Sequence, residues 1–197
     1  MEIKRFLEKL SSDTPTPGGG SASALAGALS ASLVEMVVGL SKRKGELKPH
    51  ERKEIKQKAS AIKRRLLRAV DEDAESYDGV IRAFRLPKDT ERQRHYRSKK
   101  IQEAYKKATV IPRCVCENAL NLLEYSRILS LKGNPNALSD IGVAGFLADT
   151  AFRGGLLNIE INLKSIKDRA FVQEMKFLIK RLKRERNEIR KKWKGTI

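Results

Sequence analysis

The sequence predicts an all-α protein, a multi-helix bundle of long antiparallel helices that forms a single domain over residues 1–197. Apolar residues recur at spacings of three and four along most of the chain, a pattern typical of helices that bury one face. No segment alternates apolar and polar residues for long enough to indicate a strand. The 197 residues, 40% of them hydrophobic, suffice for one core of ordinary domain size.

The N-terminal segment predicts a short amphipathic helix followed by a turn. Ile3, Phe6, Leu7 and Leu10 share one helical face, and residues 11–20 end the helix. Two prolines keep residues 14–17 extended, and three glycines then let the backbone turn. Because a serine hydroxyl can accept from free helix N–H groups, we expect Ser21 to be the N-cap of the next helix.

The second helix is the most apolar segment and is expected at the centre of the core. Its large apolar residues form one stripe, and small residues beside the stripe leave room for a close neighbour: Leu25, Leu29, Leu33, Met36 and Leu40 in the stripe, with Ala22, Ala26, Gly27 and Ala28 beside it. Residues 22–40 approach the length of a membrane span but include three serines and Glu35. We therefore interpret this segment as a buried core helix and expect no membrane partner.

Breaks by glycine and proline divide the rest of the chain into further helices. Gly45 and Pro49 break the pattern, and a long basic helix is expected to follow to about Phe84, because Leu86-Pro87 cannot continue it. Another should run from Thr90 to Leu131, with Pro112 kinking it or dividing it in two. After a turn at residues 133–136, the expected helices are Leu138 to Ile166, interrupted or tightly packed at Gly154-Gly155, and Asp168 to Lys194.

The composition favours a cytoplasmic protein without a metal. Cys114 and Cys116 are two residues apart, so they point to different sides of a helix and form no metal clamp. Neither His50 nor His95 has the spacing of a zinc site. The first residues show no continuous apolar leader, which makes the cytoplasm the expected compartment.

The net charge of +18 favours an anionic partner without choosing one. Basic runs such as Lys42-Arg43-Lys44 and Lys63-Arg64-Arg65 leave open a basic helical nucleic-acid-binding protein. Aromatic residues are sparse and no known nucleic-acid module is visible, so nucleic acid is the second choice. A charged, heat-adapted surface is another interpretation.

Two groups of residues are candidates for chemistry. Gly18-Gly19-Gly20-Ser21 opens a helix and either binds an anion or forms a simple turn; it lacks the signature of a nucleotide loop. Asp73 and Tyr77 are one helical turn apart. They are either an acid/base and a hydroxyl group that share a cleft, or solvated groups on the surface. A further polar set serves either a ligand or helix capping and buried amide bonds: Asn134, Ser139, Asp140, Asn158 and Asn162.

The order of several motifs resembles one family, the formiminotetrahydrofolate cyclodeaminase and methenyltetrahydrofolate cyclohydrolase family. The likeness extends from the first helix to about Asp168 and is most specific in the Pro-Gly-Gly-Gly-Ser entry to an Ala-rich helix. The motifs, in order, are residues 14–24, Asp73 to Tyr77, Leu86-Pro87-Lys88, Val110-Ile111-Pro112, Gly133-Asn134-Pro135-Asn136 and Ser139-Asp140.

The resemblance implies an all-helical homodimer that binds a tetrahydrofolate derivative and works without metal or a further cofactor. Cyclodeaminases close 5-formiminotetrahydrofolate to 5,10-methenyltetrahydrofolate with release of ammonia, and the related cyclohydrolases open the methenyl ring with water. We expect the cyclodeaminase activity and keep the cyclohydrolase as the alternative, because both act on the same carbon. This chain has no room for the formiminotransferase domain to which some members are fused.

The expected site follows from the same resemblance. Asp73 and Asp140 are the candidates for proton transfer, with neither assigned as acid or base. The expected substrate-binding residues are Pro17, Gly18, Gly19, Gly20, Ser21, Tyr77, Lys88, Asn134, Ser139, Asn158 and Asn162. Part of the basic surface is expected to attract the polyglutamate tail that intracellular folates commonly carry.

Overall fold

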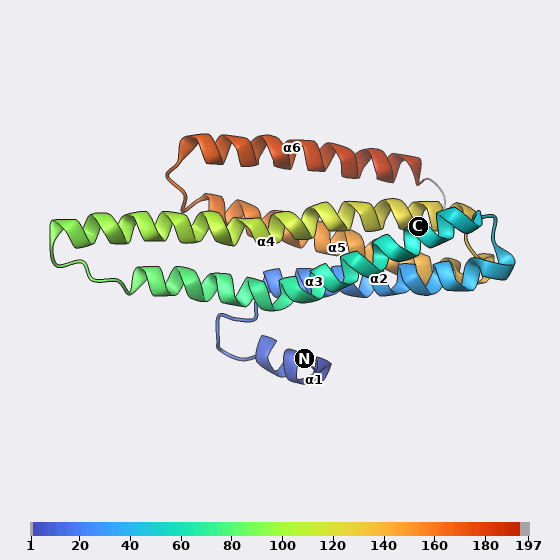
Figure 1. The fold of residues 1–197 in the computed structure, drawn as a ribbon, viewed down its shortest axis with the longest axis horizontal. Coiled ribbons are helices and arrows are strands. Elements are labelled where there is room, and N and C mark those ends of the chain that lie inside the picture. Colours follow the sequence, from blue (N-terminus) through green and yellow to red (C-terminus); the bar gives the residue numbers. More distant parts are fainter. Residues whose placement is uncertain (1, 194–197) are drawn as a thin grey trace.

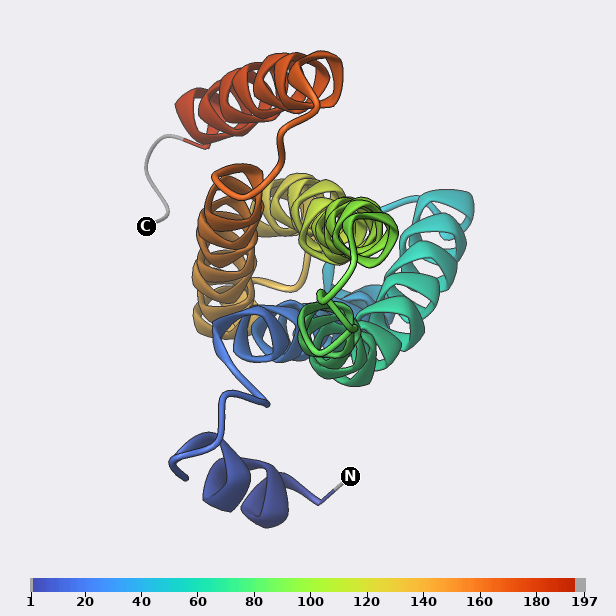
Figure 2. The same cartoon turned by 90° about the vertical axis from the view of Figure 1, so that its left-hand side faces the viewer.

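The computed structural model describes residues 2–193 and confirms an all-helical chain, with no strand in that range. The elements are α1 (Ile3–Leu10), α2 (Gly19–Lys44), α3 (Pro49–Phe84), α4 (Glu91–Lys132), the short 3-10 helix η1 (Pro135–Ala137), α5 (Leu138–Leu163) and α6 (Arg169–Lys192). The last helix was predicted to reach Lys194, which lies outside the described residues. The helices α2 to α5 surround one core, while α1 and α6 lie on opposite sides of this bundle (Figures 1 and 2).

Local capping explains where the long helices begin. Pro49 opens α3, where it needs no N–H partner, and the Lys48 N–H donates to Glu51 Oε2 at 2.8 Å. Thr90 caps α4 by accepting from the Gln93 N–H at 3.2 Å. Asp168 caps α6 by accepting from two successive backbone N–H groups. Three of the predicted boundaries therefore have a visible physical cause.

The orientation of α2 is the reverse of the sequence prediction. Its small residues Ala24, Ala28 and Ala31 are buried in the core, whereas Leu29, Met36 and Leu40 are 44%, 41% and 50% exposed. By length and composition alone α2 could cross a membrane, and half of the segment that meets this description is buried inside the bundle. The small inward residues let neighbouring helices approach closely, so the large residues point outward.

The predicted cap of α2 was wrong, and one of the two alternatives predicted for Pro112, the division of the helix, is excluded. Ser21 does not cap α2, because Gly18 is the N-cap and Ser21 is fully buried one turn inside the helix. Pro112 does not divide α4, which continues through it from Glu91 to Lys132. Pro112 is buried where α4 meets α5: an added methyl group on Gly155 would lie 3.0 Å from its carbonyl oxygen. Tertiary packing therefore supports the helix despite the missing N–H donor.

Glycines on α5 allow the tight packing predicted at residues 154 and 155. An added methyl group on Gly154 would overlap the Ser23 hydroxyl of α2, and one on Gly155 would lie 2.6 Å from Cys116 Sγ of α4. The helix α5 is not interrupted there. It therefore serves as the central helix that touches both α2 and α4.

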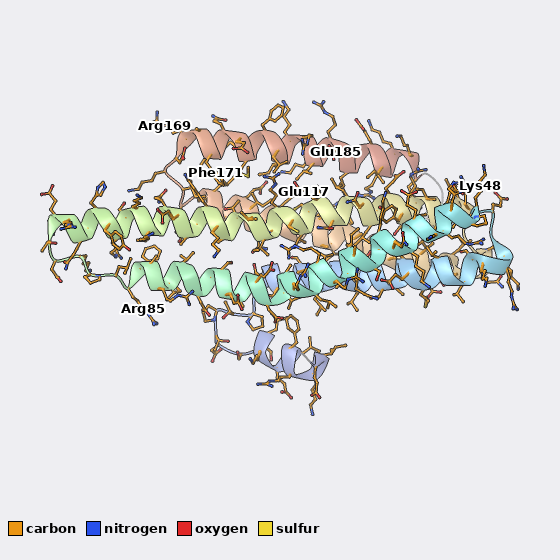
Figure 3. All side chains as sticks on the ribbon, in the orientation of Figure 1. Lys48, Arg85, Glu117, Arg169, Phe171 and Glu185 are labelled. Carbon is orange, nitrogen blue, oxygen red and sulfur yellow. The ribbon has the colours of Figure 1, made fainter. Side chains whose placement is uncertain are left out.

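The helix α6 is held against α5 at three points, one of which is the ion pair of Lys183 Nζ with Glu160 Oε1 at 2.9 Å. Arg186 donates twice to Asp149, from Nε to Oδ1 at 2.6 Å and from Nη2 to Oδ2 at 2.8 Å. Near its end, the buried Trp193 lies directly on Gly145, with no room for a side chain there. Elsewhere the outer surface is lined with charged side chains, such as Lys48 and Arg85 at the two ends of α3 and Arg169 at the start of α6 (Figure 3).

Candidate active site

The glycine turn that opens α2 brings its backbone against a carboxyl group of α3. Gly18 has extended backbone angles and ends the proline-containing loop. An added methyl group on Gly20 would overlap Asp73 Oδ1, so only glycine allows this approach. One residue later, Ser21 Oγ lies 3.0 Å from Asp73 Oδ2 and 2.9 Å from Val70 O. The turn thus positions the Asp73 carboxyl group from one side.

Burial raises the pKa of Asp73 above its ordinary value. Loss of hydration is the largest contribution, and the hydrogen bonds from the Ser21 hydroxyl and backbone N–H only partly oppose it. The geometry around Ser21 agrees with a protonated carboxyl group. The Ser21 hydroxyl has one hydrogen, and if it donates to Val70 O, a protonated Asp73 can donate its own hydrogen to Ser21 Oγ. Asp73 is therefore suited to hold and release a proton.

A pocket of about 370 Å³ opens beside Asp73. This volume lies in the usual range for small-molecule sites. The walls come from the loop before α2 and from α3, α4 and α5. They consist of Pro15, Thr16, Gly18, Gly19, Gly20, Asp73, Ser76, Tyr77, Val80, Tyr105, Ala108, Asn158, Ile161, Asn162, Lys164 and Ser165.

Two asparagines one turn apart form the α5 wall of this pocket. Asn158 Nδ2 donates to Gly154 O at 2.8 Å, and Asn162 Nδ2 donates to Ala108 O at 3.2 Å. An added methyl group on Gly19 would lie 3.9 Å from Asn158 Nδ2, so the start of α2 and the end of α5 meet here. With these amide nitrogens engaged by backbone, the amide oxygens remain as acceptors for N–H groups of a ligand.

The rim of the pocket carries a phenol group and a cation. Tyr77 is 40% exposed, and Lys164 is exposed after the end of α5. Lys164 also borders a hollow of about 350 Å³ between α5 and α6, which Lys176 lines as well. A negatively charged group extending from the pocket along Lys164 would therefore meet a second lysine, while the Glu160 carboxylate on the same wall is paired with Lys183.

The structure brings together seven of the predicted site residues: Gly18, Gly19, Gly20, Asp73, Tyr77, Asn158 and Asn162. Ser21 stands behind the pocket as a partner of Asp73, and Pro17 lies in the loop between two lining residues. The other four predicted residues do not line this pocket. Lys88 lies in the α3–α4 connection, and Asn134, Ser139 and Asp140 lie at the opposite end of α5.

At that opposite end, Asn134 holds a turn. Asn134 Nδ2 donates to Leu40 O at 3.1 Å, and the Asn136 N–H donates to Asn134 Oδ1 at 3.0 Å. Ser139 and Asp140 start α5 without acting as its cap, which is Ala137. The expected capping role of these two residues is not seen.

The sequence interpretation missed several pocket residues, notably Ser76, Tyr105 and Lys164. Ser76 is three residues after Asp73 and Lys164 two after Asn162, so helical spacing could have indicated both. Nothing in the sequence marks Tyr105, which α4 brings in from elsewhere in the chain. Among residues 2–193 no group of three His, Cys, Asp or Glu side chains is placed to hold a metal ion.

Comparison with known proteins gives one consistent family. The sequence model described as formiminotransferase-cyclodeaminase matches residues 2–181. A methenyltetrahydrofolate cyclohydrolase from Methylorubrum extorquens is 39% identical over 174 residues, covering 87% of this chain and 84% of that protein. The formimidoyltransferase-cyclodeaminase of Sus scrofa is 29% identical over 185 residues, and this chain spans only 34% of its length.

A solved structure agrees with these relatives along the whole chain. The crystal structure of formiminotetrahydrofolate cyclodeaminase from Thermotoga maritima superposes with a TM-score of 0.88 at 25% identity. The match covers 100% of this chain and 95% of the other. The fold described above is therefore the fold of a solved protein.

Proposed function

The chain belongs to the formiminotransferase-cyclodeaminase family and is an enzyme of folate one-carbon metabolism, and on this premise we propose that it is a methenyltetrahydrofolate cyclohydrolase. The observation that carries the proposal is the half-buried Asp73 at the pocket wall, with its raised pKa and its link to Ser21. The 39% identity over most of a cyclohydrolase favours hydrolysis over ring closure.

The chemistry needs a proton carrier more than an electrophile. The methenyl carbon lies between two nitrogens and is already electron-poor, so water can add to it. The leaving N5 nitrogen then needs a proton, which Asp73 can supply because its pKa is raised. The amide oxygens of Asn158 and Asn162 are suited to accept from N–H groups of the pterin ring.

Cyclodeaminase activity is the second candidate, favoured by the fold match along the whole chain. There the folate N10 nitrogen attacks the formimino carbon and ammonia leaves. The same Asp73 would protonate the departing amine. We propose both reactions without metal or a further cofactor, in a cytoplasmic homodimer, and with polyglutamylated folate as substrate. The two lysines between the pocket and α6 support the last point.

The decisive experiment follows methenyltetrahydrofolate by its near-ultraviolet absorbance in chelator-treated protein. Consumption of this substrate supports the cyclohydrolase, and its formation from 5-formiminotetrahydrofolate supports the cyclodeaminase. Asp73→Asn keeps the shape of the side chain but cannot exchange a proton, so turnover should fall by roughly a hundredfold or more. A folded protein that turns over neither substrate would refute the proposal.

A further inference from the structure

The substrates proposed for the pocket carry a positive charge at the reacting carbon. In methenyltetrahydrofolate, this carbon and its two neighbouring nitrogens share one positive charge. A formimino group bonded to nitrogen is an amidine, which takes up a proton in neutral water. A pocket for either molecule therefore has to hold a delocalised cation.

The charged groups around the pocket do not account for the binding of a cation. In the described part of the chain, Asp73 is the one carboxyl group among the lining residues, and Lys164 is the one cationic group. Burial raises the pKa of Asp73 and so favours its uncharged form, while Lys164 and the net charge of +18 repel a cation. The attraction has to come from uncharged groups, which here are amide and carbonyl oxygens and aromatic rings.

Two tyrosines line the pocket, and Tyr105 is the more firmly held. Tyr77 is 40% exposed at the rim, whereas Tyr105 is half-buried on α4. The ring of Tyr105 meets the ring of Phe84 at the end of α3, with the centroids 6.3 Å apart and the planes at 86°. Aromatic pairs prefer this edge-to-face geometry. Phe84 therefore supports the ring of Tyr105 from outside the pocket.

Arg97 fixes Phe84 in turn. Phe84 is the last residue of α3, where carbonyl groups lack a partner within the helix. Arg97 donates to the Phe84 carbonyl oxygen from both Nε and Nη2, at 3.0 Å each, and its guanidinium carbon lies 5.4 Å from the centre of the Phe84 ring. Arg97 thus holds the backbone and the ring of Phe84. Neither residue lines the pocket, so both act on a ligand through Tyr105.

The stretch of α4 that carries Tyr105 is also tied to the end of α5. Gln102 Nε2 donates to Ser165 O at 3.0 Å, and the Lys167 N–H donates to Gln102 Oε1 at 2.6 Å. Ser165 itself lines the pocket. The first turns of α4 project beyond α5 and α6 in Figure 1. Contacts with the end of α3 and with the α5–α6 connection therefore position this stretch of α4.

We propose that Tyr105 makes the pocket specific for a cationic one-carbon group, which its ring attracts, and that Phe84 and Arg97 are positioning residues for this ring. The inference rests on the proposed function, since it names the charge of the reacting group as the property that is recognised. The electron-rich face of an aromatic ring attracts a cation, most strongly where water is excluded. Tyr105 is less exposed than Tyr77 and is better suited to this role.

The attraction distinguishes the substrate of hydrolysis from its product. The positive charge disappears when water adds to the methenyl carbon, and the formyl product is neutral at this carbon. The ring therefore stabilises the bound substrate more than the bound product. Because the interaction is already made before the reaction, its loss should raise KM more than it lowers kcat.

Binding of a charged and an uncharged folate tests the role of Tyr105. Methenyltetrahydrofolate carries the charge, whereas tetrahydrofolate has the pterin and aminobenzoate rings without the bridging carbon. Calorimetric titration of Asp73→Asn protein, in which turnover is slowed, gives the Kd of both ligands. Adding Tyr105→Leu should reduce the preference for the charged ligand by about tenfold, as expected for a partly desolvated cation–π contact. Tyr105→Phe keeps the ring and should keep most of the preference.

The positioning residues are tested in the same titration. Phe84→Leu and Arg97→Leu remove the support of the Tyr105 ring without touching the pocket, so each should reduce the preference by a smaller factor than Tyr105→Leu. A general disturbance of the fold would instead weaken both ligands alike. Tyr96→Leu is the matched control, because Tyr96 is a 52% exposed aromatic residue of the same stretch of α4 and does not line the pocket.

The outcomes separate this inference from the proposed function. An unchanged preference in Tyr105→Leu protein, or equal weakening of both ligands, would overturn the inference while the proposed function stands. So would a loss of preference in Tyr105→Phe as large as that in Tyr105→Leu, because the hydroxyl group rather than the ring would then matter. If the wild-type protein bound neither ligand, the proposed function would fail together with the inference.

Discussion

The Ser21 hydroxyl has a single hydrogen and two oxygen neighbours, Val70 O at 2.9 Å and Asp73 Oδ2 at 3.0 Å. Both neighbours are acceptors when Asp73 is ionised, so one of the two contacts is then unsatisfied. Protonation of Asp73 satisfies both contacts. At the scale of the residue, burial favours the proton on Asp73 and outweighs the hydrogen bonds from Ser21, which favour the ionised form.

The raised pKa of Asp73 predicts how stability depends on pH. The folded protein binds this proton more tightly than the unfolded chain, whose aspartates titrate near 4. Stability from this group is therefore complete below that pH and is lost as the pH rises toward the folded pKa. Asn does not titrate, so the free energy of unfolding of Asp73→Asn should rise relative to wild type across this window. Urea titrations at several pH values measure the difference between the free energies of unfolding of the variant and the wild type. If this difference decreased with rising pH, the raised pKa of Asp73 would be contradicted.

Gly20 should be intolerant of a side chain because of Asp73. In Gly20→Ala the new methyl group would overlap Asp73 Oδ1 and displace the carboxyl group. We expect kcat to fall by roughly a hundredfold, the scale of a displacement of about 1 Å in a reacting group. Gly39→Ala is the matched control in the same helix, since nothing lies within 4 Å of its added methyl group. Equal activity of the two variants would show that the position of Asp73 is unimportant.

At the scale of the element, α6 packs on the bundle through the buried residues Met175, Leu178, Ile179 and Leu182, and ion pairs add to this contact. Burial acts against ionisation of Asp149, but hydrogen bonds from Arg186 and Arg153 outweigh it and lower the pKa of this carboxyl group. Trp193 then closes the far end over Gly145. Because it is the only tryptophan, its fluorescence reports on the attachment of α6.

Gly145→Ala should loosen α6 without unfolding the bundle. The added methyl group would overlap the Trp193 ring, and overpacking of this kind costs about 1–3 kcal/mol. We expect red-shifted Trp193 emission and faster hydrogen exchange in α6. Gly142→Ala, whose methyl group meets nothing within 4 Å, should keep the wild-type spectrum. An unchanged spectrum in both variants would mean that Trp193 contributes nothing to the attachment.

The positions of the helices were predictable from the sequence, whereas the face that each helix turns toward the core was less so. Glycine and proline affect the backbone locally. The end of α3 at Phe84 and the position of the turn at residues 133–136 were therefore predictable. The periodicity of α2 revealed a stripe of large apolar residues, but it did not show whether this stripe faces the core or the surface. The sequence left open whether Pro112 divides α4, because the surroundings that hold the helix together come from α5.

The site was predictable in part for the same reason. Asp73 and Tyr77 share one helical face, as do Asn158 and Asn162, so spacing alone grouped each pair. Which pairs meet depends on how the helices pack, and this packing places Asp140 at the end of α5 away from Asp73. Tyr105 and Lys164 reach the pocket from other segments, a fact that only the fold supplies.

At the scale of the whole molecule, the charge predicts an effect of substrate length. Each added glutamate of the folate tail brings a carboxylate near Lys164 and Lys176, and an exposed pair contributes about 0.2–1 kcal/mol, less at high salt. The KM for a pentaglutamate substrate should be several-fold below that for the monoglutamate, and the gap should shrink with salt.

Two controls separate this effect from general basicity. Lys176→Gln should reduce the difference between the KM values of the monoglutamate and pentaglutamate substrates. Lys53→Gln, on the exposed side of α3, should leave this difference unchanged. Equal KM values for both substrates at low salt would remove the polyglutamate proposal. Sub-micromolar binding of nucleic acid at physiological salt would instead support the basic nucleic-acid-binding alternative.

The outward stripe of α2 also affects how the protein is made. Its neighbour α5 begins about 90 residues after α2 ends. At ~5–20 residues per second, a ribosome needs roughly 5–18 seconds to synthesise that stretch. During this interval the exposed apolar residues on the outward side of α2 have no α5 beside them. The order of the helices therefore lets α2 meet α3 first during synthesis, and it leaves the α5 side of α2 uncovered until residues 138–163 have been made.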